Sequence, residues 1–487
     1  MTGDNADTVP QRRFGRHMLA LIATLFYVAG FVCAGHAVLT VRTAQGAIAW
    51  SVSLAAMPFV AVPAYLVLGR SEFQGTVDAY EARRDDIDEL IGEIRAQLEP
   101  WARPSADRPD VYNALKALSG FDLVGRNRTE LLIDGEATFD SILAGIAGAQ
   151  DYVLFQFYMI HDDELGRRVR DALIERARAG VRVFVLYDEI GSHGLPPEYV
   201  DALQEAGVQV SSFRPNRGWR NRFQLNFRNH RKIVVVDGRS SWVGGHNVGD
   251  EYLGQDPDFS PWRDTHLRID GPAAIQLQAV VLGDWYWATR EIPALNWRPT
   301  PAEDADTPVM ILPSSPSRRL EAAGLMFTTA LHSARERIWI SAPYFVPDEA
   351  VMKALYLAAL RGVDVRIITT EKPDSLPVHL AAFHYIRQLR DTGIRFYAYS
   401  PGFLHQKVML VDDDFATVGT ANFDNRSFRL NFEVTAAVAE PEFAAEMAQM
   451  FERDFANSVI IDPASIDEKP LYWRLGVALS RLAAPVL

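Results

Sequence analysis

The sequence predicts an α/β protein built from two tandem βα repeats related by a pseudo-two-fold axis, preceded by a hairpin of two transmembrane helices. Three observations lead to this prediction. Two long uncharged stretches stand near the start of the chain, short apolar strands alternate with helical stretches after about residue 120, and similar segments return about 180 residues later. A chain of 487 residues has room for two or three domains.

The first 70 residues are expected to form the membrane anchor. Residues 18–40 and 47–69 are uncharged stretches of 23 residues each, and about 20 apolar residues span a hydrocarbon core of about 30 Å. A cleaved signal peptide is the alternative for the first stretch, because arginines precede it. The second stretch follows so closely that a retained anchor with two spans is favoured.

The distribution of arginine around the two stretches predicts their orientation. Arg42 alone lies between them, whereas three arginines precede the first stretch and three follow the second. Positively charged residues concentrate on the cytoplasmic side. We therefore expect both ends of the hairpin, and the rest of the chain, in the cytoplasm.

Residues 71–110 are expected to hold an amphipathic connecting helix, since five apolar residues recur there at helical spacing. One strand–helix–strand cycle then spans 151–190 and a second spans 336–371. The Pro-rich, acidic segment 292–308 separates the copies. The expected halves are residues 111–297 and 298–487, and the second half ends in an amphipathic helix. The apolar residues of the connecting helix are Ile87, Leu90, Ile91, Ile94 and Leu98.

One polar pattern occurs once in each half, beginning at His230 and at His405. Histidine and lysine stand two positions apart before four apolar residues, and residues i and i+2 of a strand leave the same face. A pseudo-two-fold axis would bring both pairs into one four-residue site. The shared pattern is His230, Lys232, Asp237, Gly244 and Asn247 in the first half and His405, Lys407, Asp412, Gly419 and Asn422 in the second.

These residue types suit phosphodiester transfer. One imidazole can attack phosphorus while the other, protonated, donates to the leaving oxygen. Two lysines, with Asn247 and Asn422 as neutral donors, suit the equatorial oxygens of a pentacoordinate phosphoryl group. The second nitrogen of each histidine needs a partner, and Glu433 and Asp264 are the candidates. The small residues Gly244, Gly245, Gly419 and Thr420 are expected to let the backbone approach the phosphate.

Metal and nucleic-acid functions are disfavoured. A zinc site is the competing interpretation of the histidines, but the chain has no HExxH motif and only one cysteine, Cys33. We expect no metal and no cofactor. The net charge of -13 argues against a general nucleic-acid binder.

The paired motifs "HRKIVVVDGRSSWVGGHN" and "HQKVMLVDDDFATVGTANFDNRS" resemble the HKD motifs of the phospholipase D superfamily. The membrane hairpin, with "QFYMIHDDELG", "SAPYFVPDE" and the C-terminal "LYWRLGVALSRLAAPVL", is similar to bacterial cardiolipin synthases. The resemblance covers residues 10–487. It implies two phospholipase D-like βα sandwich repeats in the inner membrane of a bacterium, in a multi-pass protein.

The resemblance also implies a reaction and residue roles. The expected reaction is metal-independent transfer of a phosphatidyl group from one phosphatidylglycerol, an anionic phospholipid, to another, giving cardiolipin and glycerol through a phosphohistidine. By likeness to the family, His230 is the nucleophile and His405 is the general acid and base. Lys232, Lys407, Asn247 and Asn422 match phosphate-holding positions, and Asp237 and Asp412 match aspartates that position the motif. The chain departs from the family pattern at Gly245, where serine is usual.

Two further segments agree with a lipid substrate. Residues 214–232 interleave seven arginines or lysines with three aromatic residues, which suits an anionic membrane surface, although a solvated basic loop is the alternative. The last seventeen residues place leucines at helical spacing, for a helix at the membrane interface or packed on the protein.

The functional alternatives use the same residues. Phospholipase D hydrolysis and phosphatidylserine synthase-type transfer differ from the expected reaction only in the acceptor. An HKD endonuclease and a membrane scaffold without catalysis are more distant alternatives. The sequence does not indicate the oligomeric state.

Overall fold

A computed structural model of the chain describes residues 8–69, 73, 81, 83–104, 108–214, 226–317 and 320–487. The chain forms two compact units, each described by itself below. The smaller contains Met1–Gln74 and Pro215–Phe227, and the larger contains Gly75–Arg214 and Arg228–Leu487. Most of the basic and aromatic segment 214–232 lies outside the described residues, because 215–225 are not among them.

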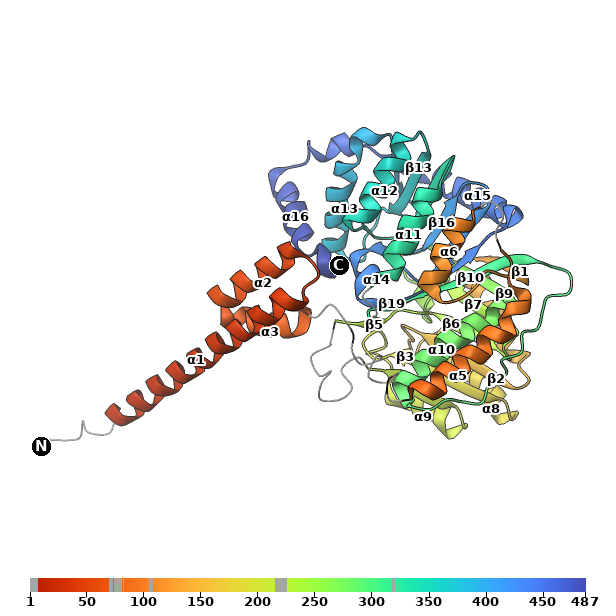
Figure 1. The fold of residues 1–487 in the computed structure, drawn as a ribbon, viewed down its shortest axis with the longest axis horizontal. Helices are drawn as coiled ribbons and strands as arrows, with labels where there is room; N and C mark the ends of the chain where they lie inside the picture. Colours follow the sequence, from red (N-terminus) through yellow and green to blue (C-terminus); the bar gives the residue numbers. More distant parts are fainter. Residues whose placement is uncertain are drawn as a thin grey trace, which may run out of the picture. The chain divides into compact units, whose positions relative to one another are not determined.

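The smaller unit is built from three apolar helices, α1 (Thr8–Thr40), α2 (Ala44–Ala56) and α3 (Pro58–Leu68) (Figure 1). Leu54 and Tyr65 are buried against α1. A Cβ added to Gly30 of α1 would lie 2.6 Å from the carbonyl oxygen of Leu54, so this glycine allows close helix packing. Within the described residues, one helix is long and apolar enough to cross a membrane, over His17–Thr40.

The second uncharged stretch is divided into two helices at Met57. Its φ of −137° and ψ of 57° lie outside the helical region. Pro58 explains this break, because the proline ring disfavours the α conformation of the residue before it. The expected span 47–69 is therefore two shorter helices in the structure.

The larger unit is organised around one sheet, in which sixteen of the described strands are connected. Its order is β20-β14-β13-β11-β16-β17-β19-β10-β1-β9-β7-β6-β2-β3-β4, with β5 attached to β19. The order reads the same outward from the antiparallel pair β1–β10 in both directions: β9 corresponds to β19, β7 to β17, β6 to β16 and β2 to β11. The predicted α/β fold with two repeats about a pseudo-two-fold axis is confirmed.

The strands of the larger unit have the following bounds. Those of the first half are β1 (Val124–Ile133), β2 (Tyr152–Phe157), β3 (Arg182–Asp188), β4 (Gln209–Phe213), β5 (Arg228–Asn229), β6 (Ile233–Val236), β7 (Ser240–Gly244), β8 (Trp262–Arg263) and β9 (Thr265–Asp270). Those of the second half are β10 (Thr307–Ser314), β11 (Arg337–Ser341), β12 (Phe345–Val346), β13 (Asp364–Thr370), β14 (Arg395–Tyr399), β15 (Phe403–Leu404), β16 (Val408–Val411), β17 (Phe415–Gly419), β18 (Phe423–Asp424), β19 (Asn431–Val438) and β20 (Ser458–Ile461).

Helices pack on the sheet in both halves (Figure 1). α5 (Arg84–Leu98) belongs to the connecting segment, and α6 (Pro109–Ser119) packs in the core of the second half. Those of the first half are α7 (Asp134–Ala147), α8 (Glu164–Arg178), α9 (Pro197–Glu205) and α10 (Ala273–Thr289). Those of the second half are α11 (Ala322–Ser333), α12 (Glu349–Leu360), α13 (Leu376–Gln388), α14 (Asn425–Arg429), α15 (Pro441–Ala456) and α16 (Leu471–Leu482). Short 3₁₀ helices are η1 (Glu99–Trp101), η2 (Asp250–Leu253), η3 (Arg390–Thr392), η4 (Pro463–Ile466) and η5 (Ala484–Val486).

The C-terminal helix α16 is amphipathic, as its leucine spacing predicts. Trp473 packs edge-on against Phe383 of α13, with ring centroids 5.0 Å apart. The leucines on the other face are exposed, among them Leu471, Leu475 and Leu479. One side of α16 therefore packs on the protein and the other offers an apolar surface.

Candidate active site

Each motif histidine stands just before a buried strand and is held by the other half of the chain. β6 and β16 begin one residue after Lys232 and Lys407, so the histidine–lysine pairs precede the strands in which the sequence placed them. β5 pairs in parallel with β19, and β15 pairs in parallel with β8. These two short pairings place each motif against the opposite repeat.

The backbone of each histidine is also hydrogen-bonded to the opposite half. The N–H of His230 donates to the carbonyl of Phe432 at 3.0 Å, and the N–H of His405 donates to the carbonyl of Arg263 at 2.8 Å. Glu433 is the next residue in β19, and Asp264 directly follows β8. Each histidine is thus positioned to meet a carboxylate from the opposite repeat.

The carboxylates contact the imidazoles at the same ring nitrogen. Nδ1 of His230 lies 3.0 Å from Oε2 of Glu433, and Nδ1 of His405 lies 2.8 Å from Oδ2 of Asp264. A carboxylate at Nδ1 fixes the tautomer and the orientation of the ring. Nε2 of each ring is then the nitrogen that can react with a ligand.

The two histidines and the two lysines are buried, and the lysine of each half lowers the pKa of the histidine of the other half. Burial lowers the pKa of His230 to about 4, although Glu433 acts in the opposite direction. Burial also lowers the pKa of His405 well below its usual value, and the charges of Lys407, Lys232 and His230 lower it further. Burial therefore favours the neutral form of both imidazoles.

The lysines occupy equivalent positions in the two motifs. Nζ of Lys232 donates to the carbonyl of His230 at 2.7 Å, and Nζ of Lys407 donates to the carbonyl of His405 at 2.5 Å. Burial lowers the pKa of Lys232 well below its usual value and that of Lys407 to about 8. An ammonium has three donors, so each lysine keeps protons for an anionic ligand.

The two motif asparagines differ in their surroundings. Asn247 is held on both sides, because its Nδ2 donates to the hydroxyl of Tyr252 at 2.6 Å and its Oδ1 accepts from the N–H of Met159 at 3.3 Å. The Oδ1 of Asn422 is buried without a hydrogen bond to any described residue. The amide of Asn422 is therefore the less constrained of the two.

The glycines of the motifs make room for protein atoms. A Cβ at Gly245 would lie 2.0 Å from Oδ1 of Asp264, and one at Gly244 would lie 2.5 Å from the carbonyl oxygen of Thr265. A Cβ at Gly419 would lie 2.6 Å from the carbonyl oxygen of Val434. The sequence suggested that these residues admit the phosphate, whereas in the structure the glycines admit neighbouring strands and the carboxylate of Asp264.

Thr420 is the counterpart of Gly245 in the second motif. Its hydroxyl donates to Oε2 of Glu433 at 2.6 Å, and its backbone carbonyl lies 3.1 Å from Nδ1 of His230. The first half therefore has a glycine at this position, whereas the second half has a threonine whose hydroxyl donates to the carboxylate of Glu433.

The motif aspartates cap backbone turns. Asp237 and Asp412 have left-handed φ values of 53° and 54°. Asp237 accepts from three consecutive N–H groups before and at the start of β2, and Asp412 does the same before β11 and also pairs with Arg108 at 2.7 Å. Burial opposes ionisation of Asp412, but these hydrogen bonds and Arg108 lower its pKa. The donors to Asp237 are Gln150, Asp151 and Tyr152, and those to Asp412 are Arg335, Glu336 and Arg337.

Sequence reasoning missed three residues at this site. The ring of Tyr158 lies 4.9 Å from that of His230 and 5.2 Å from Nζ of Lys232. Ser427 and Asn431 each donate to Oε1 of Glu433 at 3.0 Å. Tyr158 has a counterpart in Tyr344, 186 residues further on, but this match indicates only the repeat and not a place at the site. Ser427 ends the quoted second motif and Asn431 follows it closely, but their approach to Glu433 depends on the turn formed by α14.

A possible metal-binding group lies outside these residues. Ligand atoms of His161, Asp163 and Glu251 lie within 4.8 Å of one another. Oδ1 of Asp163 caps α8 by accepting from the N–H of Gly166 at 2.9 Å, and Oδ2 accepts from the N–H of Asp250 at 2.7 Å. These bonds give Asp163 a structural role without a metal.

Comparison with known proteins identifies the family. The family model described as "Cardiolipin synthase, PLD-like domain" matches residues 142–262 and 327–455. A protein named cardiolipin synthase A from Pseudomonas fluorescens (strain SBW25) is 48% identical over 482 residues, which cover 97% of this chain and 99% of that protein. One of the same name from Pseudomonas aeruginosa is 46% identical over 493 residues, covering 100% and 99%.

The solved structure of phosphatidylserine synthase from Haemophilus influenzae Rd KW20 has the same fold. Its TM-score is 0.57 with 13% sequence identity, and the match covers 77% of this chain and 100% of that one. The two segments matched by the family model contain His230 with Lys232 and His405 with Lys407. The chain therefore belongs to the family of cardiolipin synthases with phospholipase D-like domains.

Proposed function

We propose that the protein transfers a phosphatidyl group from one phosphatidylglycerol to another and so forms cardiolipin and glycerol. The relatives named cardiolipin synthase A cover nearly the whole chain. The observation that carries the proposal is the exchange of carboxylates, which orients His230 and His405 in one buried site. Two oriented imidazoles beside two lysines are what a two-step phosphoryl transfer requires.

In the first step, Nε2 of His230 attacks the phosphorus of phosphatidylglycerol. The bond from phosphorus to the oxygen of the glycerol headgroup breaks, and protonated His405 gives its proton to that oxygen. Glycerol leaves, and the phosphatidyl group remains bonded to His230. Neutral His230 is ready to attack because burial lowers its pKa to about 4. The anionic phosphodiester favours protonated His405, since a nearby negative charge raises the pKa of an imidazole.

In the second step, neutral His405 accepts the proton of a hydroxyl on the headgroup of a second phosphatidylglycerol. The resulting oxygen attacks phosphorus, the bond to His230 breaks, and cardiolipin is released. Lys232, Lys407 and Asn422 would donate to the equatorial phosphoryl oxygens in both steps. Asn247, Asp237 and Asp412 would hold the motifs in position, and no metal or cofactor takes part.

We also propose a location and a domain organisation. Residues 1–70 would anchor the protein in the bacterial inner membrane as a multi-pass segment, with α1 as one span and α2 with α3 as the return. Residues 71–110 would connect the anchor to the catalytic halves, 111–297 and 298–487, on the cytoplasmic side. The apolar helix α1 and the exposed leucines of α16 support contact with lipid.

A product assay tests the proposal. The purified full-length protein is given phosphatidylglycerol labelled in the headgroup glycerol and in the phosphate, in detergent micelles, with and without a chelator. Cardiolipin and free labelled glycerol in equal amounts, unchanged by the chelator, are expected. Phosphatidic acid as the only phosphate-labelled product would replace the proposal with phospholipase D hydrolysis. Phosphatidylserine formed only when CDP-diacylglycerol and serine are supplied would replace it with serine transfer.

A further inference from the structure

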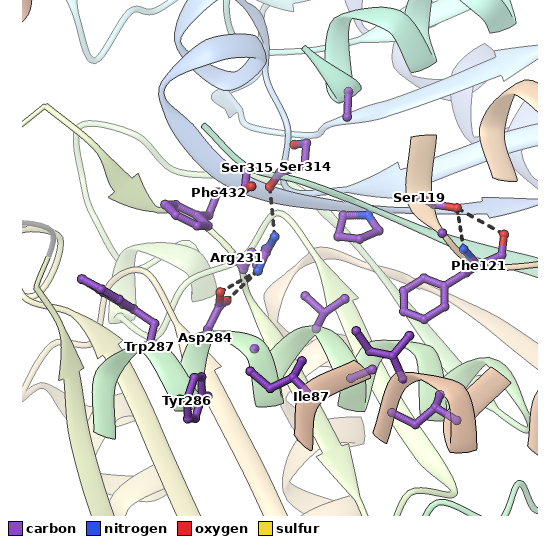
Figure 2. A pocket seen from close by; sticks show the side chains of 18 of the residues that line it. Ile87, Ser119, Phe121, Arg231, Asp284, Tyr286, Trp287, Ser314, Ser315 and Phe432 are labelled. Atoms are coloured by element: carbon purple, nitrogen blue, oxygen red, sulfur yellow. Dashed lines mark hydrogen bonds and ion pairs between the residues drawn. The ribbon is translucent and has the colours of Figure 1, made fainter. Parts of the chain in front are cut away.

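A cavity of about 360 Å³ lies between α5 and α10 in the larger unit (Figure 2). Ile87, Ile91 and Ile94 of α5 form one wall, at the i, i+4 and i+7 positions of a helix. Ala279 and Gly283 of α10 lie in the opposite wall. The volume is within the range of small-ligand sites, about 300–1,000 Å³.

The cavity exists because α10 has small residues where it faces α5. A Cβ added to Gly283 would meet no atom within 4 Å. The equivalent helix of the second half, α15, has Gln449 and Arg453 at the same distances before its buried Asp454 as Ala279 and Gly283 have before Asp284. The small residues that leave room for the cavity therefore belong to α10 and are not repeated at the same positions of α15.

The floor of the cavity is the reverse side of the catalytic segments. Side chains alternate along extended chain, so His230, Lys232 and Glu433 face the candidate active site while Arg231 and Phe432 face the cavity. The guanidinium of Arg231 lies 5.6 Å from the centre of the Phe432 ring. A ligand in this cavity would touch the backs of the strands that hold the catalytic histidine.

The guanidinium of Arg231 is held by hydrogen bonds and an ion pair to other residues, so it forms a rigid floor of the cavity. Its NH1 pairs with Asp284 at 2.7 Å, its Nε donates to the carbonyl of Glu433 at 3.0 Å, and its NH2 donates to the carbonyl of Ser314 at 3.0 Å. Figure 2 shows Arg231 between Asp284 and Ser314. The cavity therefore offers no buried, unpaired positive charge at its floor.

One charged group in the lining is available to a ligand. The hydroxyl of Ser314 also borders the cavity, but its oxygen is buried and makes no hydrogen bond to any described residue. Arg95 of α5 is an exposed member of the lining, and it forms no ion pair within the described part of the chain. An apolar chain with a negative headgroup would match the isoleucines and Arg95 together.

We propose that this cavity binds one acyl chain of an anionic phospholipid that is not the lipid undergoing reaction. The reacting phosphate lies on the opposite side of the strand segments 230–232 and 431–433, so the ligand of the cavity is a second molecule. Its chain packs between the isoleucines of α5 and the small residues of α10. The inference needs a lipid surface but does not depend on which acceptor the enzyme uses.

Photo-crosslinking tests the proposal on the full-length protein. The probe is phosphatidic acid with a diazirine in one acyl chain, mixed into detergent micelles, because it is anionic and has no headgroup glycerol to lose. Mass spectrometry of the digested protein is expected to find the label on peptides from Arg84–Leu98 and Ala273–Thr289. Gly283→Leu, which fills the cavity, is expected to reduce this labelling at least about tenfold, whereas Gly283→Ala retains it.

A second pair of variants covers the case in which Gly283→Leu does not fold. Ile91→Asp places a carboxylate in the apolar wall and is expected to reduce the labelling to a similar degree. Gly92→Asp carries the same charge on the exposed side of α5, where an added Cβ meets no atom, and is expected to label like the parent protein. Equal labelling of Ile91→Asp and Gly92→Asp, or label confined to α1–α3, would overturn the proposal.

Cardiolipin formation by the same preparations is measured separately. Synthesis without label at the cavity removes the second lipid site and leaves the proposed function standing. Label at the cavity without cardiolipin formation supports the second lipid site and overturns the proposed function.

Discussion

The two halves of the candidate site use the same backbone arrangement but hold their carboxylates differently. Glu433 accepts from Thr420, Ser427 and Asn431 in addition to contacting His230. Asp264 accepts from the backbone N–H of Thr265 at 2.8 Å and contacts His405, in space left by Gly245. A carboxylate with several donors is the better fixed as an anion. The duplicated halves have therefore become specialised around their histidines.

This comparison supports the assignment of different roles to the two histidines. The nucleophile keeps its orientation while it forms and breaks a bond to phosphorus, so the more rigid carboxylate, Glu433, suits His230. The acid and base changes its protonation in every step, which suits the less heavily bonded Asp264 beside His405. Five measurements can break or sharpen this comparison.

Loss of either imidazole is expected to have the largest effect. His230→Ala and His405→Ala should each lower the initial rate of cardiolipin formation at least about 10³-fold, because each removes a reacting group. An acid quench after mixing with phosphate-labelled lipid distinguishes the roles. Slow protein labelling is expected in His405→Ala and none in His230→Ala, and the reverse pattern would exchange the roles.

Neutralising each carboxylate should cost less than losing the ring. Glu433→Gln is expected to lower the rate by about 10²-fold to 10⁴-fold, because it puts an amide N–H toward donors and removes the charge that orients His230. Asp264→Asn should cost less, since fewer donors depend on it. Steady-state rates with separate kcat and KM values provide the comparison, and a larger loss for Asp264→Asn would contradict it.

Single substitutions at the equivalent positions Gly245 and Thr420 test why the halves hold their carboxylates differently. Gly245→Ser should lower the rate by tens of fold, on the order of 2 kcal/mol, because its Cβ would be 2.0 Å from Oδ1 of Asp264 in the present geometry. Thr420→Gly removes one hydrogen bond to Glu433 and should cost no more than about tenfold. Circular dichroism controls for folding. A fully active Gly245→Ser would show that Asp264 does not need that space.

The pH dependence should reflect Lys407. Its pKa is lowered to about 8 by burial, so the ammonium is present below that pH and is lost as pH rises through it. kcat/KM, which follows the free enzyme, is expected to fall about tenfold for each pH unit above about 8. Lys407→Arg should move this decline to higher pH, because the guanidinium stays protonated. A decline that stays at the same pH in Lys407→Arg would assign it to another group.

The motif aspartates should affect stability more than chemistry. Asp412→Asn is expected to lower stability by about 1–3 kcal/mol, because Arg108 loses a buried partner. Asp237→Asn loses the charge but no ion pair, so it should lower stability by less. Asparagine tolerates the left-handed φ at both positions. Thermal unfolding of the purified protein in detergent compares the two. Equal shifts in Tm would show that the ion pair with Arg108 adds nothing.

Much of this fold follows from the sequence. The alternation of strands and helices, and the return of one polar pattern in both halves, predict two repeats that meet at His230 and His405. Glu433 and Asp264 were candidates because a reacting histidine needs a partner for its second nitrogen, and the structure has both at Nδ1. These features depend on local periodicity and on chemical need, which a single sequence carries.

The remainder depends on tertiary packing. The spacing of the motif does not indicate that each histidine takes its carboxylate from the opposite repeat. The lack of space for a side chain at Gly245 follows from the pairing of β7 with β9, which the sequence does not show. The break at Met57, in contrast, agrees with the kink that Pro58 predicts, because proline disfavours a helical residue before it. The cavity arises from the way α5 and α10 pack against each other. The isoleucines of α5 predict that one face of this helix is buried, but they do not predict a cavity beside it.

The exchange of carboxylates removes the redundancy that a duplication normally provides. After most duplications one copy can decay while the other maintains the activity. Here damage to Glu433 would disable the histidine of the first repeat, and damage to Asp264 would disable that of the second. Neither copy can compensate for a defect in its twin, so both must remain under selection for as long as the enzyme is needed.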